Sequence, residues 1–413
     1  MAGAAAGVGP RGRGRKMIAA GAARSPTSGE RGSGRARALN IPSLDGIRAC
    51  AVMLVFVSHA GLHGKVPGEF GVTVFFFLSG YLITTLLRIE YEQSGSISFR
   101  AFYLRRVLRI FPPFYLALTV ATVLWLLGAF RYGPGFSLDG LLAQALFLTN
   151  YYVIHNGWWV GHAPGTWIFW SLCVEEHYYL AFPVVYVLLL RFLRSRHRQA
   201  LALAGLCTLV LTWRLVLVYT LGVGKDRTYM ATDTRIDSIL FGCILGVFAN
   251  PVLDRTRIDH GTWKYILVPL ALGGLFVSFV VRDPAFQKSM AYTLQGICLF
   301  PLFIVAVRFP GWVPCQVLNL SWVRFVGVLS YSIYLVHPAV LFGISSWTRL
   351  PWIVQGTIGL ALTLAIAYGI YVAVERPAAR LRKRLSRTLV PERPAAPSTA
   401  GMPAVAIAGQ AGS

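Results

Sequence analysis

The sequence has few charged residues, and acidic residues are the scarcest of them. Of its 413 residues only 13% are charged, with 16 Asp and Glu against 39 Lys and Arg, whereas 55% are hydrophobic. A soluble domain of this length needs a more polar surface, so the composition excludes a soluble globular protein. We therefore expect a polytopic membrane protein.

Paired cysteines, metal-ligand clusters and internal repeats are also missing. The six cysteines are scattered, and all but Cys315 fall inside apolar segments. We predict neither a disulfide framework nor a metal site. The first 40 residues lack a short apolar stretch with a cleavage site, so we expect no removable signal peptide.

The formal charge of +23 is concentrated at the two ends of the chain. Residues 1–40 carry eight Lys or Arg and one Glu, and the segment after Glu375 carries seven Lys or Arg and one Glu, so the ends supply +7 and +6. Most of the remaining charge lies in short loops, where basic residues set membrane orientation and do not indicate nucleic-acid binding. We predict a disordered basic tail at 1–40, a membrane domain at 41–378, and a basic, then Pro/Ala-rich, disordered tail at 379–413.

Eleven apolar segments follow residue 43, and ten of them are long enough, or nearly so, to cross a bilayer. The segment 138–152 is short, and excluding it places the arginine cluster at 191–198 on the same side as the other basic loops. The sequence thus predicts an all-α membrane bundle of ten transmembrane helices plus one short re-entrant or interfacial segment, with both termini cytoplasmic.

The first apolar segment carries an arginine and a histidine on one helical face. Arg48 and His59 are eleven residues apart, which returns to within about 20° of the same direction and spans roughly 16 Å. Ionisable groups inside a membrane helix are costly and often mark a reaction centre, and Asp45 is placed to pair with Arg48. The plainer alternatives are an interfacial histidine and a snorkelling arginine.

The next two segments offer small residues and a basic cluster. Ser79 and Gly80 stand in the middle of the second segment, where small residues allow close helix packing. A basic cluster of Arg105, Arg106 and Arg109 begins the third segment. Such arginines either signal topology or bind phosphate groups.

Further polar residues lie inside later apolar segments. Glu175 and Glu176 begin one of them, near the expected membrane depth of His59. Two adjacent carboxylates cost free energy at this depth, so they are expected to serve a function. Arg235 and Asp237 read as an intramembrane ion pair. Tyr334 and His337 share a helical face, and the proline that follows His337 makes a structural role at a kink equally plausible for that histidine.

These motifs together resemble the acyltransferase 3 family of integral membrane O-acyltransferases. The resemblance covers about residues 40–385 and rests on the following stretches: SLDGIRA with the distal His59, FFFLSGYLI, FYLRRVLRIFPPFY, WSLCVEEHYYL, TDTRIDSILFG, LSYSIYLVHP and VERP. It implies a ten-span bacterial inner (plasma) membrane enzyme that moves an acyl group, commonly acetyl, from cytoplasmic acyl-CoA to a hydroxyl of a glycan, glycolipid or other acceptor. Many members append an esterase-like domain, and we expect this chain to be a stand-alone member that acts alone or with a separate partner, such as polysaccharide biosynthesis or export proteins.

By motif, the resemblance makes His59 and Arg48 the essential pair of the first span and Arg106 with Arg109 the donor-site motif. We expect the phosphates of acetyl-CoA to dock at Arg105, Arg106 and Arg109, without a metal. His59 would be a general base, or a transient acyl carrier, with Glu175 orienting it. Arg48 would hold the donor or stabilise charge at the thioester oxygen. The supporting residues are Asp45, Ser79, Arg235, Asp237, Tyr334 and His337.

Two other classes of protein fit a polytopic chain with buried charge. A secondary transporter or flippase would favour repeats and broken helices and would not need a phosphate-binding mouth. A non-catalytic membrane subunit of polysaccharide export would not need the histidine.

Overall fold

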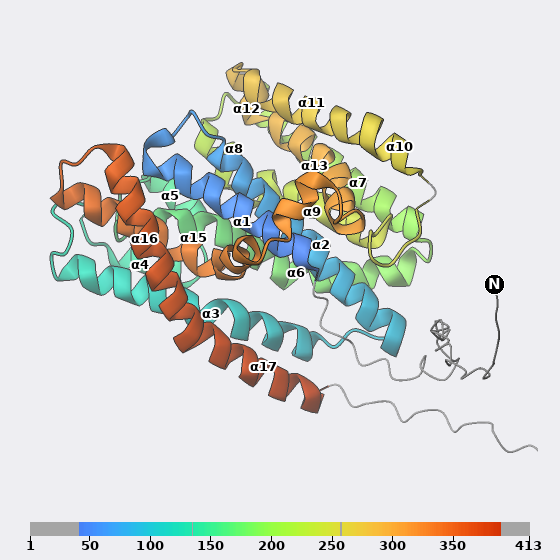
Figure 1. Ribbon diagram of the computed structural model, residues 1–413, viewed down its shortest axis with the longest axis horizontal. Helices are drawn as coiled ribbons and strands as arrows, with labels where there is room; N and C mark the ends of the chain where they lie inside the picture. The colour runs from blue at the N-terminus through green and yellow to red at the C-terminus, as the bar shows by residue number, and fades with distance from the viewer. Residues whose placement is uncertain (1–40, 134, 257, 390–413) are drawn as a thin grey trace, which may run out of the picture. The chain divides into compact units, whose positions relative to one another are not determined.

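The computed structural model describes residues 41–389 except 134 and 257, with side chains through residue 385. The predicted tails at 1–40 and 390–413 lie outside the described residues. Within this part of the chain the regular elements are helices and no strand forms, which confirms the predicted all-α class (Figure 1).

The α-helices are α1 (Pro42–Val57), α2 (Gly68–Ser94), α3 (Phe99–Leu126), α4 (Leu138–Ala145), α5 (Thr149–Asn156), α6 (Trp170–Phe192), α7 (Arg196–Leu215), α8 (Lys225–Met230), α9 (Thr232–Val247), α10 (His260–Thr262), α11 (Val268–Val280), α12 (Pro284–Lys288), α13 (Met290–Arg308), α14 (Val313–Leu318), α15 (Ser321–Trp347), α16 (Trp352–Ile370) and α17 (Arg376–Leu389). Short π-helical segments adjoin several of them, namely η2 (Ser58–Leu62), η4 (Val216–Thr220), η5 (Trp263–Leu267) and η6 (Tyr371–Glu375). A 3₁₀-helix, η3 (Thr166–Phe169), precedes α6.

Nine helices of the described residues are long and apolar enough to cross a membrane, so the chain is an integral membrane protein. The predicted tenth span, 236–250, corresponds to α9, which has 16 residues and rises only about 24 Å. The count of ten therefore stays a prediction. The segment 138–152 forms α4 and α5, each of eight residues, and neither can cross about 30 Å of hydrocarbon.

Helix α9 is short, but it lies in the interior, where it packs against α2, α7 and α13 (Figure 1). Its contact with α2 depends on glycines on both helices. A Cβ atom at Gly80 would overlap the carbonyl oxygen of Ile239, and one at Gly242 would overlap that of Phe77. The close packing expected of the small residues near the middle of α2 is thus present at Gly80.

Helices α1 and α15 lie side by side and run in the same direction. Near their N-terminal ends, the backbone of Asp45 touches Gly327 so closely that a Cβ there would not fit. Further along, the ring of His59, just after the end of α1, meets the ring of His337 in the interior of α15. This pairing brings together residues that are 278 positions apart in the sequence.

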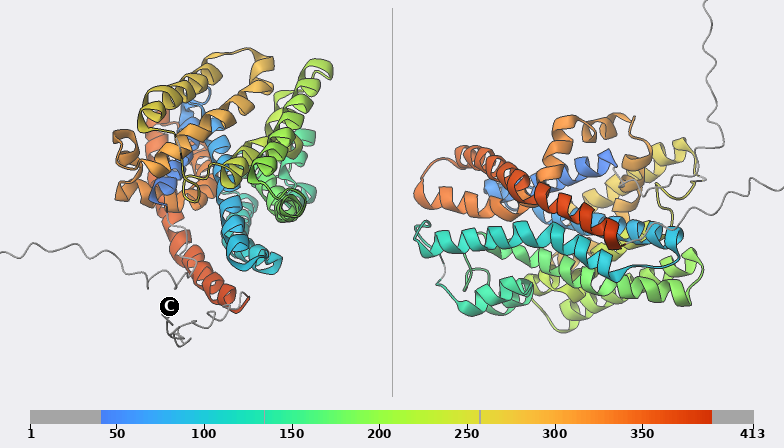
Figure 2. Two further views of the ribbon diagram at one scale, coloured as in Figure 1. Left: turned by 90° about the vertical axis from the view of Figure 1, so that its right-hand side faces the viewer. Right: turned by 90° about the horizontal axis from the view of Figure 1, so that it is seen from below.

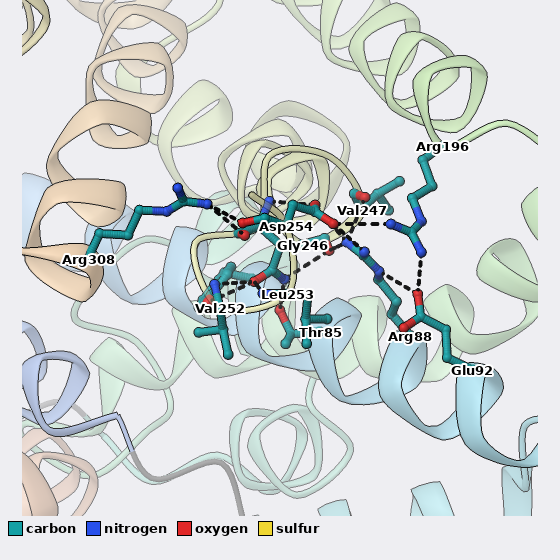
Figure 3. A network of polar contacts seen from close by, with 12 residues as sticks. Thr85, Arg88, Glu92, Arg196, Gly246, Val247, Val252, Leu253, Asp254 and Arg308 are labelled. Carbon is teal, nitrogen blue, oxygen red and sulfur yellow. Dashed lines mark hydrogen bonds and ion pairs between the residues drawn. The ribbon is translucent and has the colours of Figure 1, made fainter. Parts of the chain in front are cut away.

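A polar network ties together the ends of four segments at the side of the bundle where α1 begins (Figure 3). Arg88 of α2 donates to Asp254 at 2.5 and 3.0 Å, and Arg196 of α7 donates to Asp254 at 3.1 Å and to Glu92 at 2.7 Å. Arg308, at the end of α13, donates to the backbone carbonyl of Asp254.

Burial alone would raise the pKa of Asp254, but the hydrogen bonds from Arg88 and from the Asn250 backbone lower it below its usual value. The arginine cluster at 191–198 therefore starts on the same side as the ends of α2 and α13.

The last helix continues beyond the predicted end of the membrane domain. The domain was predicted to end at residue 378, whereas α17 runs from Arg376 to Leu389 and packs along α3 (Figure 2). The turn η6 leads directly into α17, so the helical backbone continues past Pro377 and the proline does not end it. The boundary at 378 falls inside α17.

Candidate active site

His59 lies in a π-helical turn at the end of α1. The turn, η2, contains Gly61 with φ of 114°, a conformation that favours glycine, and the Trp352 ring packs on it. Single π-turns inside helices occur often at functional sites because they redirect side chains. The turn leaves His59 exposed at the edge of the bundle.

The ring of His59 is held by His337. The two rings stack with centroids 5.2 Å apart, and His59 Nδ1 lies 2.9 Å from His337 Nε2. His337 is fully buried, and its Nδ1 lies 3.0 and 2.9 Å from the carbonyl oxygens of Ile333 and Tyr334. Carbonyls only accept, so His337 Nδ1 carries a proton.

The tautomer of His59 follows from this chain of contacts when both rings are neutral. His337 then has an unprotonated Nε2, which accepts the proton on His59 Nδ1. The remaining nitrogen of His59, Nε2, is left without a proton. This assignment rests on the hydrogen-bond network and gives an exposed imidazole whose free lone pair can accept a proton.

Tyr334 fixes the helix that carries His337. Its hydroxyl lies 2.6 Å from Ser171 Oγ and donates to the carbonyl of Ile168 at 3.1 Å, which links α15 to the start of α6. Tyr334 and His337 are on one side of α15, as the sequence spacing predicted, with ring centroids 5.9 Å apart.

Glu175 does not contact His59. Its carboxylate accepts hydrogen bonds from Ser79 at 2.8 Å and from Tyr179 at 3.3 Å. The span begins at Thr166, before the segment start that the sequence suggested, so Glu175 lies roughly 13 Å inside it. The expectation that Glu175 orients His59 is therefore wrong as a direct contact, and His337 occupies that position.

Arg48 forms the expected ion pair with Asp45, at 2.8 Å. It also lines a cavity of about 310 Å³ at the end of the bundle where α1 begins. Helices α1, α3, α15 and α17, with the turn η6, surround this cavity. The lining residues are Arg48, Leu108, Arg109, Gly327, Val328, Ser330, Tyr331, Tyr371, Glu375, Arg376, Ala379, Arg380, Arg382 and Lys383.

The three arginines at the start of α3 have three different environments. Arg109 lines the cavity. Arg105 forms an ion pair with Glu90 at 2.8 Å, and Arg106 lies over the rings of Phe102 and Tyr179 at 5.8 and 5.7 Å from their centroids. The cluster was predicted as one group, but only Arg109 is among the residues that line the cavity.

The predicted ion pair between Arg235 and Asp237 does not form. Asp237 accepts from Arg214 at 2.6 and 3.0 Å, and both side chains are fully buried. Arg235 instead donates to Thr73 at 3.0 Å and lies 4.0 Å from the centroid of the Tyr292 ring. Residues two apart on a helix point in nearly opposite directions, so they cannot pair.

Arg214 and the basic face of α17 were not predicted from the sequence. Arg214 is a lone arginine in an apolar run, which is itself a signal of a buried partner. The basic residues of α17 from Arg380 onward were assigned to a disordered tail. Among the described residues, no group of three or more His, Cys, Asp or Glu side chains is placed to hold a metal ion.

The fold and these sites together define a helical membrane protein with a histidine pair at one end and a cationic cavity at the other. An acyltransferase domain model (Acyl_transf_3) matches residues 41–372, and the chain belongs to this family. No solved structure matches the chain.

Two curated relatives carry names that describe the reaction. The chain is 27% identical over 316 residues to the peptidoglycan O-acetyltransferase OatA of Listeria monocytogenes, which covers 73% of this chain and 49% of that protein. It is 29% identical over 326 residues to the O-acetyltransferase OatA of Staphylococcus aureus, which covers 74% and 51%. The chain thus spans about half the length of these relatives.

Proposed function

We propose that this protein is a membrane O-acyltransferase that moves an acetyl group from acetyl-CoA to a hydroxyl of a surface or exported glycan or glycolipid. The observation that carries the proposal is the hydrogen bond between His59 Nδ1 and His337 Nε2, which leaves Nε2 of this exposed histidine free. The family and the names of its relatives support acetyl transfer.

The proposed step is direct attack by the acceptor. His59 Nε2 takes the proton from the acceptor hydroxyl while its oxygen attacks the thioester carbonyl carbon. The tetrahedral intermediate collapses, the carbon–sulfur bond breaks, and the proton on His59 passes to the leaving CoA sulfur. His337 is a positioning residue that holds the His59 ring and its tautomer.

The donor is proposed to bind through the cationic cavity. Arg109 and Arg48 line it, and guanidinium groups bind phosphates strongly. Arg48 lies roughly 16 Å from His59 along α1, so we assign it to the donor and not to the thioester oxygen. Tyr331 lines the cavity on α15 and is roughly 9 Å of helix rise from His337, so a donor arm would extend toward the histidines.

Orientation follows from the same proposal, because acyl-CoA is cytoplasmic. We place the cavity, both termini and the 191–198 cluster in the cytoplasm of the bacterial inner membrane, with His59 toward the outer face. In a cysteine-free background, an impermeant thiol reagent added outside is expected to label Lys65→Cys and to spare Arg198→Cys, since both positions are exposed. Strong external labelling of Arg198→Cys in intact cells would contradict this orientation.

The different environments of the α3 arginines predict different kinetic effects. Arg109→Gln is expected to raise the KM for acetyl-CoA about tenfold with little change in kcat, because it removes a phosphate contact made alike in ground and transition states. Arg105→Gln is the matched control, since Arg105 already pairs with Glu90, and should change KM less than about twofold. Equal KM values for wild type and Arg109→Gln would mean that Arg109 sets membrane topology and does not bind the donor.

Release of free CoA tests the activity itself. Purified protein in nanodiscs, given acetyl-CoA and a hydroxyl-bearing glycan acceptor, is expected to release one thiol for each ester formed. A secondary transporter or flippase, or a non-catalytic export subunit, would release none. Absence of thiol release with every acceptor tested would contradict the proposal.

A further inference from the structure

Helix α17 contributes more cationic side chains to the cavity than any other element. Six of the lining residues are Lys or Arg, against the single carboxylate of Glu375. Four of the six belong to α17, namely Arg376, Arg380, Arg382 and Lys383. Nothing in the proposed catalytic step uses them.

These charges are largely uncompensated within the described residues. The carboxylate of Glu375 accepts a hydrogen bond from Ser332, and the Asp45 carboxylate pairs with Arg48. No carboxylate of the described part of the chain lies within ion-pairing distance of Arg380, Arg382 or Lys383. Like charges gathered around one cavity repel one another unless an anion lies between them.

Three of these four charges, Arg376, Arg380 and Lys383, share one face of α17, and these residues line the cavity while remaining exposed at its mouth. Arg376, Ala379, Arg380 and Lys383 recur at helical spacing and line the cavity, while Leu381, which is 47% exposed, lies on the opposite face. The helix packs along α3 (Figure 2). Arg109 of α3 lines the same cavity as the basic residues of α17. At about 310 Å³ the cavity is within the size range of small-molecule sites.

We infer that α17 forms the nucleotide half of the donor site, in which Arg380, Arg382 and Lys383 bind the 3′-phosphate and diphosphate of CoA. The inference rests on the proposed function and deepens it. Anionic lipid headgroups share this phosphate chemistry. We favour the nucleotide over a lipid headgroup because the cavity lies between four helices. Residues of α15 line it as far as Tyr331, on the same helix that carries His337.

Binding of adenosine 3′,5′-bisphosphate by the purified full chain tests the inference without requiring turnover. In phosphatidylcholine nanodiscs, Arg380→Gln and Arg382→Gln are each expected to weaken binding about tenfold. Arg384→Gln removes the same charge from a residue of α17 that does not line the cavity, and is expected to weaken binding less than about twofold. Gln keeps helix propensity, and an unchanged melting temperature would show that the variants fold.

Two further measurements distinguish nucleotide phosphate from lipid phosphate, and the nucleotide site from the proposed acetyl transfer. Bisphosphate binding that persists when phosphatidylglycerol is added supports a nucleotide site, and its abolition would assign the cavity to lipid headgroups and overturn the inference. With S-acetyl-pantetheine, which lacks the nucleotide, Arg382→Gln should match wild type in kcat/KM, whereas with acetyl-CoA it should fall about tenfold. Equal bisphosphate affinities of wild type, Arg380→Gln and Arg382→Gln would overturn the inference even if acetyl transfer is observed. Bisphosphate binding with the expected variant pattern would uphold the nucleotide site even if transfer is not.

Discussion

Replacement of His59 by Gln is expected to lower kcat for acetyl transfer on the order of 10²- to 10⁴-fold, the range that a general base contributes. Gln keeps most of the size and hydrogen-bonding capacity of the imidazole but cannot take the acceptor proton. Because the cationic cavity lies roughly 16 Å away along α1, affinity for CoA should be unchanged. Single-turnover rates and CoA binding, measured on the same preparation, check both parts.

His337 provides the matched control for this prediction. In His337→Gln a side-chain carbonyl can still accept the proton on His59 Nδ1, whereas His337→Leu offers no acceptor. The Gln variant should therefore retain more turnover than the Leu variant, with both still binding CoA. Turnover of His59→Gln close to wild type would show that His59 only positions the acceptor.

Loss of the Asp237 carboxylate is expected to cost about 3–5 kcal/mol of unfolding free energy, the usual penalty for leaving one member of a buried ion pair alone. Asp237→Asn removes the partner of Arg214, and both side chains are fully buried. Denaturant titration of the purified protein in mixed micelles measures the change.

The identity of the partner can be tested by double variants. Arg214→Met with Asp237→Leu removes both charges and should recover most of the lost stability, because apolar replacement of a whole buried pair is often neutral. Arg235→Met with Asp237→Leu leaves Arg214 without a carboxylate and should remain destabilised. Recovery of stability by the Arg235→Met double variant, and not by the Arg214→Met double variant, would show that Arg235 is the partner of Asp237 after all.

The sequence predicted the helices well, because long apolar runs have few alternatives in a membrane protein. It also predicted local pairs correctly. Asp45 meets Arg48, and Tyr334 shares a face with His337, since helical spacing alone fixes such neighbours. The chain thus carries its secondary structure and its short-range contacts in the pattern of its residues.

Contacts between distant helices could not be predicted in the same way. His59 meets His337 because α1 packs closely on α15, with Gly327 against the backbone of Asp45, and Asp237 meets Arg214 because α7 packs on α9. Neither packing can be read from the spacing of residues within one segment. The basic face of α17 was missed because the residues from 379 onward were predicted to be a disordered tail, whereas the helical backbone continues through η6 into α17.

Mass spectrometry of surface glycans tests the central claim most directly. A strain that lacks the gene would be complemented with wild type or with His59→Gln, each shown to be present in the membrane at equal amounts. The account predicts that one acetyl increment disappears from a glycan or glycolipid in the deletion strain, returns with wild type and does not return with His59→Gln. Full restoration by His59→Gln, or glycans of the deletion strain identical to those of its parent, would contradict it.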